Sequence, residues 1–194
     1  MTTKTIRFFA VTTDPDGFQY FLVEDLGAVR DVIFDGSPKI DTWSPPDVYS
    51  YQPRLREGDF WDFGLGGVGA AFAVRPEALE TVEYHLSFAG ELLPVPYQGR
   101  EFVVANITEC IDALDHDATT WIYDERGKRH DVRHPVFRLD RLGWNLFKVP
   151  ETAITRIYCW QDNPEAVEQF KSCVEIEGLT GLLFRELYSV SLSA

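Results

Sequence analysis

The chain has 194 residues, of which 45% are hydrophobic and 14% aromatic. This length and composition predict one sizeable folded core and exclude a disordered chain. The 31 acidic residues outnumber the 18 basic ones and leave a formal net charge of −13. Direct binding to nucleic acid is disfavoured, because phosphate contacts need clustered Lys and Arg. The charge is compatible with a basic protein partner and also with plain solubility, which needs no partner.

The sequence shows no membrane segment and no disulfide framework. No apolar run reaches the roughly 18 residues that a bilayer-spanning helix needs, and the first residues lack the features of a secretory signal. The three cysteines, Cys110, Cys159 and Cys173, are odd in number and form no CxxC pair. We therefore expect a cytoplasmic protein whose thiols are small core residues.

The first 60 residues are predicted to form a hairpin followed by a long loop. The β-rich segments 5–12 and 18–23 flank Asp14-Pro15-Asp16-Gly17, in which proline and glycine favour a turn. Residues 26–34 fit either a second strand pair or a short helix. Residues 35–58 contain four prolines and few apolar runs, so we expect a surface loop that either binds something or wraps the core.

Residues 64–69, GLGGVG, match the GxGxxG pattern of dinucleotide-binding proteins. The pattern binds a pyrophosphate only where a strand precedes it and a helix starts at its last glycine. Here a predicted strand, 70–74, follows instead, and the next helix starts at Pro76. We therefore predict a flexible glycine loop and no cofactor.

Two predicted helices, 76–88 and 164–177, begin with the same Pro-Glu-Ala and end before Gly90 and Gly178. Each is followed by a short apolar run typical of a strand, so the chain contains two strand–helix–strand units. The matching apolar positions are Leu79, Val82 and Leu86 in the first helix and Val167, Phe170 and Val174 in the second.

Most segments between the two helices are predicted strands. Residues 119–123 and 129–132 bracket the turn at 124–127 and indicate a hairpin. Further strands are expected at 136–139, 146–149 and 154–160. The predicted class is α+β, with a largely antiparallel sheet and two main helices. We expect a single domain over 1–194, with 1–60 as its N-terminal hairpin and loop and 70–190 as its core.

The stretch 101–117, EFVVANITECIDALDHD, contains five acidic residues and no Lys or Arg. Its apolar start predicts a buried strand, and Asn106 and Thr108 are cap-type residues that favour a helix over 109–117. On such a helix Asp112 and Asp115 would share one face. These carboxylates could bind a cation, contact a partner or simply face water.

Other candidate sites are weaker. His130 and His134 lie on a predicted strand, where i and i+4 side chains stand roughly 13 Å apart, too far for one ion. Cys110 and His116 could form a thiolate pair, but the spacing implies no third residue to orient them. We therefore predict no catalytic residue, no metal and no cofactor.

Several segments from Phe72 to the C-terminus carry a family resemblance. The most specific are the Asn106…Asp112…Asp115 run and the ending at 179–184, LTGLLF; the others are 73–79, 91–95, 102–106, 110–115, 136–139 and 165–167. Over its last two thirds the chain resembles immunity family eleven of bacterial polymorphic toxin systems, formerly a domain of unknown function. The resemblance implies a non-enzymatic cytoplasmic inhibitor that neutralises a toxin.

Together with the negative charge, the resemblance predicts that an acidic surface occupies the basic cleft of a nuclease-type toxin. The candidate contacts are Asp112, Asp115 and Asp117, with Asp59, Trp61 and Asp62 as a second patch beside the glycine loop. The alternative is a small metal-dependent hydrolase or ligand-binding domain that uses the 109–117 helix with His116. A structural or scaffold role is a third interpretation.

Overall fold

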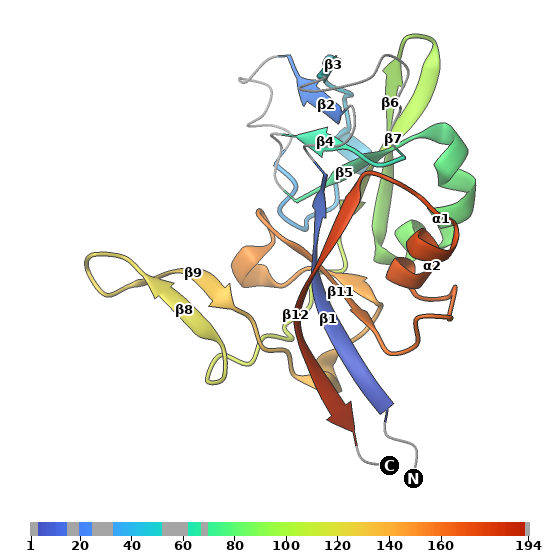
Figure 1. The fold of residues 1–194 in the computed structure, drawn as a ribbon. Coiled ribbons are helices and arrows are strands. Elements are labelled where there is room, and N and C mark those ends of the chain that lie inside the picture. Colours follow the sequence, from blue (N-terminus) through green and yellow to red (C-terminus); the bar gives the residue numbers. More distant parts are fainter. Residues whose placement is uncertain (1–3, 15–19, 25–32, 52–61, 67–69, 193–194) are drawn as a thin grey trace.

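The computed structural model describes residues 4–14, 20–24, 33–51, 62–66 and 70–192. These ranges contain two α-helices, and most of the remaining regular structure is antiparallel strand. The predicted α+β class is therefore confirmed. The two ends of the described chain lie side by side, because Lys4 pairs with Leu192 (Figure 1).

The first helix connects the two outer strands of a three-stranded antiparallel sheet. Strands β5 (Phe72–Val74) and β6 (Gly90–Tyr97) flank β7 (Arg100–Ile107), and α1 (Pro76–Ala89) connects β5 to β6. Because both outer strands run antiparallel to β7, they run parallel to each other. This is a split strand–helix–strand unit.

The second helix occupies the same place in a four-stranded sheet. Strands β11 (Ile157–Gln161) and β12 (Leu182–Leu192) flank β1 (Lys4–Thr13), and both are antiparallel to it. Helix α2 (Phe170–Ile176) lies between β11 and β12 along the chain. The short β10 (Leu146–Phe147) extends the sheet beyond β11.

The predicted pair of strand–helix–strand units is thus present, and α1 contacts α2 (Figure 1). Helix α1 begins at Pro76 as predicted. Proline lacks a backbone N–H, and the first helical position needs none because it has no intrahelical acceptor. Helix α2 begins six residues later than predicted. Asn163 and Gln169 accept backbone N–H groups through their side chains and hold the preceding segment in turns.

The predicted N-terminal hairpin is wrong. Among the described strands, β1 pairs with β11 and β12, whereas β2 (Tyr20–Val23) lies between β3 (Val48–Tyr51) and β4 (Leu65–Gly66) in another sheet. Residues 8–11 of β1 are all buried, so this strand suits the centre of a sheet that is covered on both faces. The predicted turn at 14–17 lies outside the described residues apart from Asp14, and residues 25–32 also lie outside them.

Three more expectations need correction. The predicted loop 35–58 contains β3 and the 3₁₀ turn η2 (Ile40–Thr42), and the glycine loop contributes β4. The predicted strand at 136–139 is a single bridge between Phe137 and Leu114, followed by the 3₁₀ turn η3 (Leu139–Arg141).

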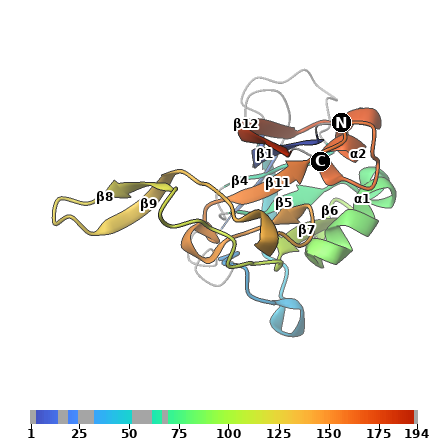
Figure 2. The same cartoon turned by 90° about the horizontal axis from the view of Figure 1, so that it is seen from below.

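The predicted hairpin after the acidic stretch is confirmed. Strands β8 (Thr120–Tyr123) and β9 (Arg129–His134) pair antiparallel. They form an arm that projects from the body in both views (Figures 1 and 2).

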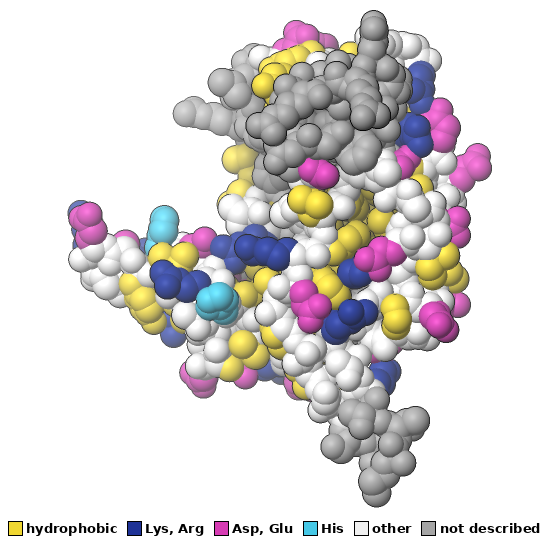
Figure 3. Space-filling view, in the orientation of Figure 1, with side chains coloured by type: hydrophobic (Ala, Val, Ile, Leu, Met, Phe, Trp, Pro, Cys, Tyr) yellow, Lys and Arg dark blue, Asp and Glu magenta, His cyan; other side chains and the backbone are white. Residues whose placement is uncertain are grey.

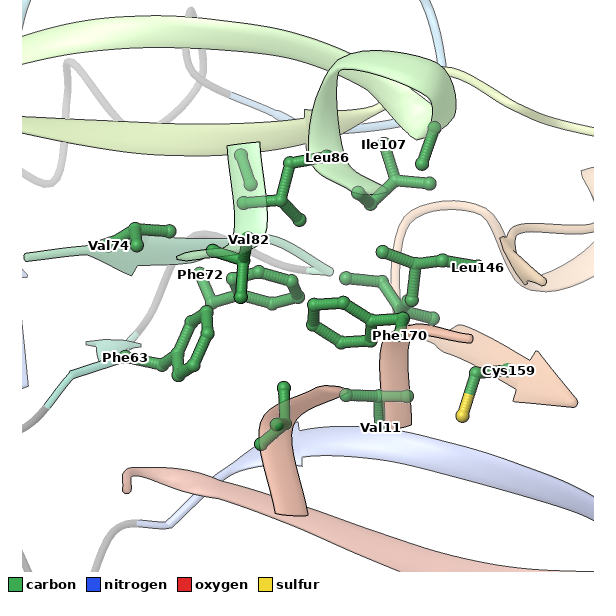
Figure 4. Packing of buried hydrophobic residues seen from close by; sticks show 14 of the residues in the cluster. Val11, Phe63, Phe72, Val74, Val82, Leu86, Ile107, Leu146, Cys159 and Phe170 are labelled. Atoms are coloured by element: carbon green, nitrogen blue, oxygen red, sulfur yellow. The ribbon is translucent and has the colours of Figure 1, made fainter. Parts of the chain in front are cut away.

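The core has three layers of buried side chains. The central layer joins the two helices to facing sides of the two sheets, with Phe72 and Phe170 stacked at a centroid distance of 6.1 Å (Figure 4). A second layer packs the other face of the β5-β7-β6 sheet against Phe21 and Phe34. A third layer covers the other face of β1 and β11 with Leu114, Phe137 and neighbouring residues. The central strands β1 and β7 and their neighbours β11 and β5 are therefore buried on both faces, which explains their continuous apolar sequences, whereas β12 and most of β6 stay partly exposed.

Candidate functional site

The acidic segment that follows β7 is extended rather than helical, so the predicted helix over 109–117 is wrong. Cys110 forms a bridge with Lys148, and Leu114 forms another with Phe137. The backbone N–H of Asp115 donates to the carbonyl of Val136 at 2.8 Å. Pairing with distant segments thus satisfies the backbone that a helix would have satisfied locally.

A tight turn then places the carboxylates at the surface. The Asp115 carboxylate accepts the backbone N–H groups of Asp117 and Ala118 at 3.1 and 3.0 Å, an Asx-type turn. The turn borders a surface pocket of about 490 Å³. We call this the acidic pocket; it is lined by Asp112, Leu114, Asp115, His116, Asp117 and Arg138.

The three predicted aspartates are therefore brought together, but they differ in their surroundings. Asp112 is 75% exposed and forms an ion pair with Arg138 at 3.1 Å. The same guanidinium also donates to the Asp112 carbonyl at 2.6 Å. Asp115 holds the turn, whereas Asp117 is exposed and pairs with no described residue through its carboxylate. Asp117 is the member best placed to contact another molecule.

His116 connects the pocket to a residue that follows β10. Its Nε2 lies 2.5 Å from Oε1 of Glu151, which belongs to the 3₁₀ turn η4 (Pro150–Thr152). The other carboxylate oxygen of Glu151 is buried without a hydrogen-bond partner among the described residues. Asp112, His116 and Glu151 each offer a ligand atom, and these atoms lie within 4.8 Å of one another. Nitrogen and carboxylate ligands of this kind suit Zn²⁺ and related ions.

Of the second predicted patch, only Asp62 lies within the described residues. It is 5% exposed, so it is not part of an open surface. One carboxylate oxygen forms an ion pair with Arg75, and the other accepts the N–H and hydroxyl of Thr180 at 2.7 and 2.9 Å. Its role in the structure is to join two loops. Asp59 and Trp61 lie outside the described residues.

The thiolate pair of Cys110 with His116 finds no support. Burial raises the pKa of the Cys110 thiol, which favours the unreactive protonated form. Its neighbour Lys148 is fully buried, donates to the carbonyl of Phe34 at 2.8 Å, and has a pKa lowered to about 8 by desolvation. His130 and His134 lie on the strand β9 as predicted.

Sequence reasoning missed Glu151 and Arg138 as members of the site. Both follow the acidic segment by more than twenty residues and lie in short segments with no periodic pattern.

The space-filling view shows how charge is distributed on one face of the molecule. Lys, Arg and His side chains gather along the β8–β9 arm and its base, while acidic side chains are scattered over the body (Figure 3).

Neither helix within the described ranges has the length and apolar composition needed to span a bilayer. No protein-family model matches the chain, and no curated protein sequence matches it.

Proposed function

We propose that the protein is an immunity protein that binds a basic bacterial toxin and inhibits it without chemical turnover. The observation that carries the proposal is the acidic pocket, where three carboxylates border one hollow of a chain with net charge −13. The choice of a toxin as the partner rests on the resemblance of residues 72–184 to the immunity family.

The charge distribution favours rapid capture of a cationic surface. The pocket is lined by three carboxylates and by one guanidinium, that of Arg138. The carboxylate of Asp117 is free to meet a Lys or Arg of a partner. Complementary charges raise association rates at low salt by one to three orders of magnitude. A hollow of about 490 Å³ accommodates one or two long basic side chains.

The test uses the product of the reading frame next to this gene. We expect that its expression arrests growth of a bacterial host and that co-expression of this chain restores growth. In stopped-flow binding with the purified product, Asp117→Lys should lower the association rate about tenfold at low salt and reduce its salt dependence.

Glu177→Lys is the matched control, because Glu177 is exposed at the end of α2 and its reversal changes the net charge equally. If the adjacent product is harmless or does not bind, the immunity function is wrong. If it binds and both variants behave alike, the function stands but the acidic pocket is not the contact.

A metal-dependent hydrolase or ligand-binding domain is the second candidate, and the cluster of Asp112, His116 and Glu151 is the observation that favours it. An ion with ligand distances near 2.0–2.2 Å would replace the hydrogen bond between His116 and Glu151. It would also give the unpartnered oxygen of Glu151 a partner.

Metal content of the purified protein and calorimetric titration with Zn²⁺ and Mn²⁺ separate the two functions. A metal-dependent enzyme should bind one ion per chain and lose this ion in His116→Gln. His130→Gln is the control, since His130 is exposed on the β8–β9 arm. Absence of binding in the wild-type chain would eliminate this candidate.

A further inference from the structure

Two exposed aromatic rings and one partly buried ring form a cluster on the outer side of α1. Tyr84 and Phe88 are 56% and 60% exposed, although large apolar side chains are usually buried. They are four residues apart and therefore share one face of the helix, with ring centroids 4.8 Å apart. Trp144, from the loop before β10, stacks on Phe88 at 5.0 Å and meets Tyr84 edge-on at 5.7 Å. We call these three residues the aromatic cluster.

The core beneath α1 holds the aromatic cluster in place. The Trp144 indole N–H donates to the carbonyl of His85 at 3.1 Å, and its ring packs on the central core layer. The opposite side of α1 is buried through Val82, His85 and Leu86. The exposed rings are thus carried by a rigid support, so binding would order few additional side chains.

Acidic residues lie on the same helix as the aromatic cluster and beside the loop that carries Trp144. Helix α1 contains three glutamates and no Lys or Arg, and Glu80 lies one turn before Tyr84 on the same face. Glu80 and Glu83 are exposed and form no ion pair with any described residue. The carboxylate of Glu109 lies against Gly143, next to Trp144. Hydrophobic and acidic side chains lie side by side over α1 in Figure 3.

We propose that the aromatic cluster is the main affinity determinant for a Lys- or Arg-bearing segment of the proposed toxin, and this proposal rests on the proposed function. Aromatic residues with a charged rim are typical of the centre of protein interfaces. The aliphatic stem of a Lys or Arg would cover Phe88, its charge would face a ring, and Glu80 or Glu83 would accept its hydrogen bonds.

The charge also selects this occupant over two others. A second copy of the chain would bring a net charge of −13 against the same glutamates, and an anionic membrane surface would be repelled in the same way. Only a cationic partner gains from both the rings and their rim.

The separation of the aromatic cluster from the acidic pocket is small enough for one interface to cover both. Arg138 borders the pocket and Trp144 belongs to the cluster, and six residues of chain span at most about 22 Å. A standard interface covers roughly 800 Å² per partner, which corresponds to a width of about 30 Å. In such an interface the acidic pocket would raise the association rate, and the aromatic cluster would lower the dissociation rate.

The experiment measures binding of the adjacent reading-frame product to Phe88→Ala and Tyr84→Ala, with Tyr123→Ala as control. Tyr123 has the same 56% exposure as Tyr84 but lies on the β8–β9 arm. Alanine suits an exposed helical position, so both helix variants should remain folded by circular dichroism. We expect Phe88→Ala to weaken binding about thirtyfold, mainly through faster dissociation at all salt concentrations, and Tyr123→Ala to change it less than threefold.

The outcomes separate this proposal from the proposed function. If the wild-type chain does not bind the adjacent product, the immunity function is wrong, and the aromatic cluster loses its assigned partner with it. If the wild-type chain binds and both helix variants bind equally well, the function stands and the aromatic cluster is overturned as its contact. A loss confined to the helix variants supports both.

Discussion

Substitution of Asp62 by alanine should destabilise the fold while leaving the binding surface of the folded protein intact. Asp62 lies between the start of α1 and the loop before β12. Its carboxylate forms an ion pair with Arg75 and accepts both the N–H and the hydroxyl of Thr180. Its backbone carbonyl accepts the N–H of Arg75 at 2.9 Å, and that bond survives the substitution.

The magnitude follows from the groups that lose their partner. The half-buried Thr180 N–H would lose its acceptor, and an unsatisfied donor of this kind costs about 1–2 kcal/mol. Arg75 is 29% exposed and retains Glu77 at 3.6 Å, so solvent and this neighbour limit its share to about 1 kcal/mol. We expect a total loss of about 2–3 kcal/mol, or a fall in Tm of about 4–12 °C for a chain of this size.

Urea denaturation followed by circular dichroism measures this loss, with Asp117→Ala as the control. Asp117 is exposed and its carboxylate pairs with no described residue, so its substitution should change stability by less than about 0.5 kcal/mol. A loss below about 1 kcal/mol for Asp62→Ala, with an unchanged m-value, would show that this carboxylate does not join the two loops. Weaker binding of the proposed partner by fully folded Asp62→Ala would assign Asp62 to the partner surface.

Two further predictions concern the interior. Lys148 has its pKa lowered to about 8 from 10.5; the unfolded chain therefore binds more protons between these values, and this residue's contribution to stability increases as pH rises through that window. From pH 7 to 9, the unfolding free energy of the wild type relative to Lys148→Met should rise by about 1 kcal/mol in urea titrations, and a constant difference would contradict the burial of a charged amine. Gly181 has a φ of +95°, and an added Cβ would lie 2.1 Å from the carbonyl oxygen of Phe63, so Gly181→Ala should cost about 3 kcal/mol. Gly127→Ala, at φ +73° in open space, should cost only about 1 kcal/mol in the same assay, and equal costs would refute the steric argument.

Local signals were sufficient for the elements whose hydrogen bonds are local. Helix α1 was predicted from Pro76 and its apolar spacing, and the β8–β9 hairpin from its turn residues. The same reasoning failed at 109–117, where cap-type residues suggested a helix. There the backbone bonds to Lys148 and Val136, far along the chain, and tertiary pairing outweighs a weak local preference.

The candidate site was predictable only in part for the same reason. Its carboxylates stand out in the sequence. Arg138 reaches them because the bridge between Phe137 and Leu114 places it there, and Glu151 reaches them from the 3₁₀ turn η4. The aromatic cluster shows the same limit. The spacing of Tyr84 and Phe88 is visible in the sequence, whereas the position of Trp144 above them depends on a loop sixty residues away.

The arrangement of the two split units explains where these surfaces lie. In the first unit the central strand β7 follows α1 and β6, whereas in the second the central strand β1 comes from the start of the chain. Residues 108–156 therefore connect two complete units without contributing a strand to the centre of either sheet. This connection carries the acidic pocket, the β8–β9 arm and Trp144.

The connection and the first unit share the candidate surfaces, because Tyr84 and Phe88 lie on α1 whereas Asp117 and Trp144 lie on the connection. The two units supply the buried layers, and the connection is held against them by the buried Leu114, Phe137 and Phe147. Exposed side chains of the connection, such as Asp117, are then free to vary without loss of the fold, because loops carried by a rigid support tolerate substitution.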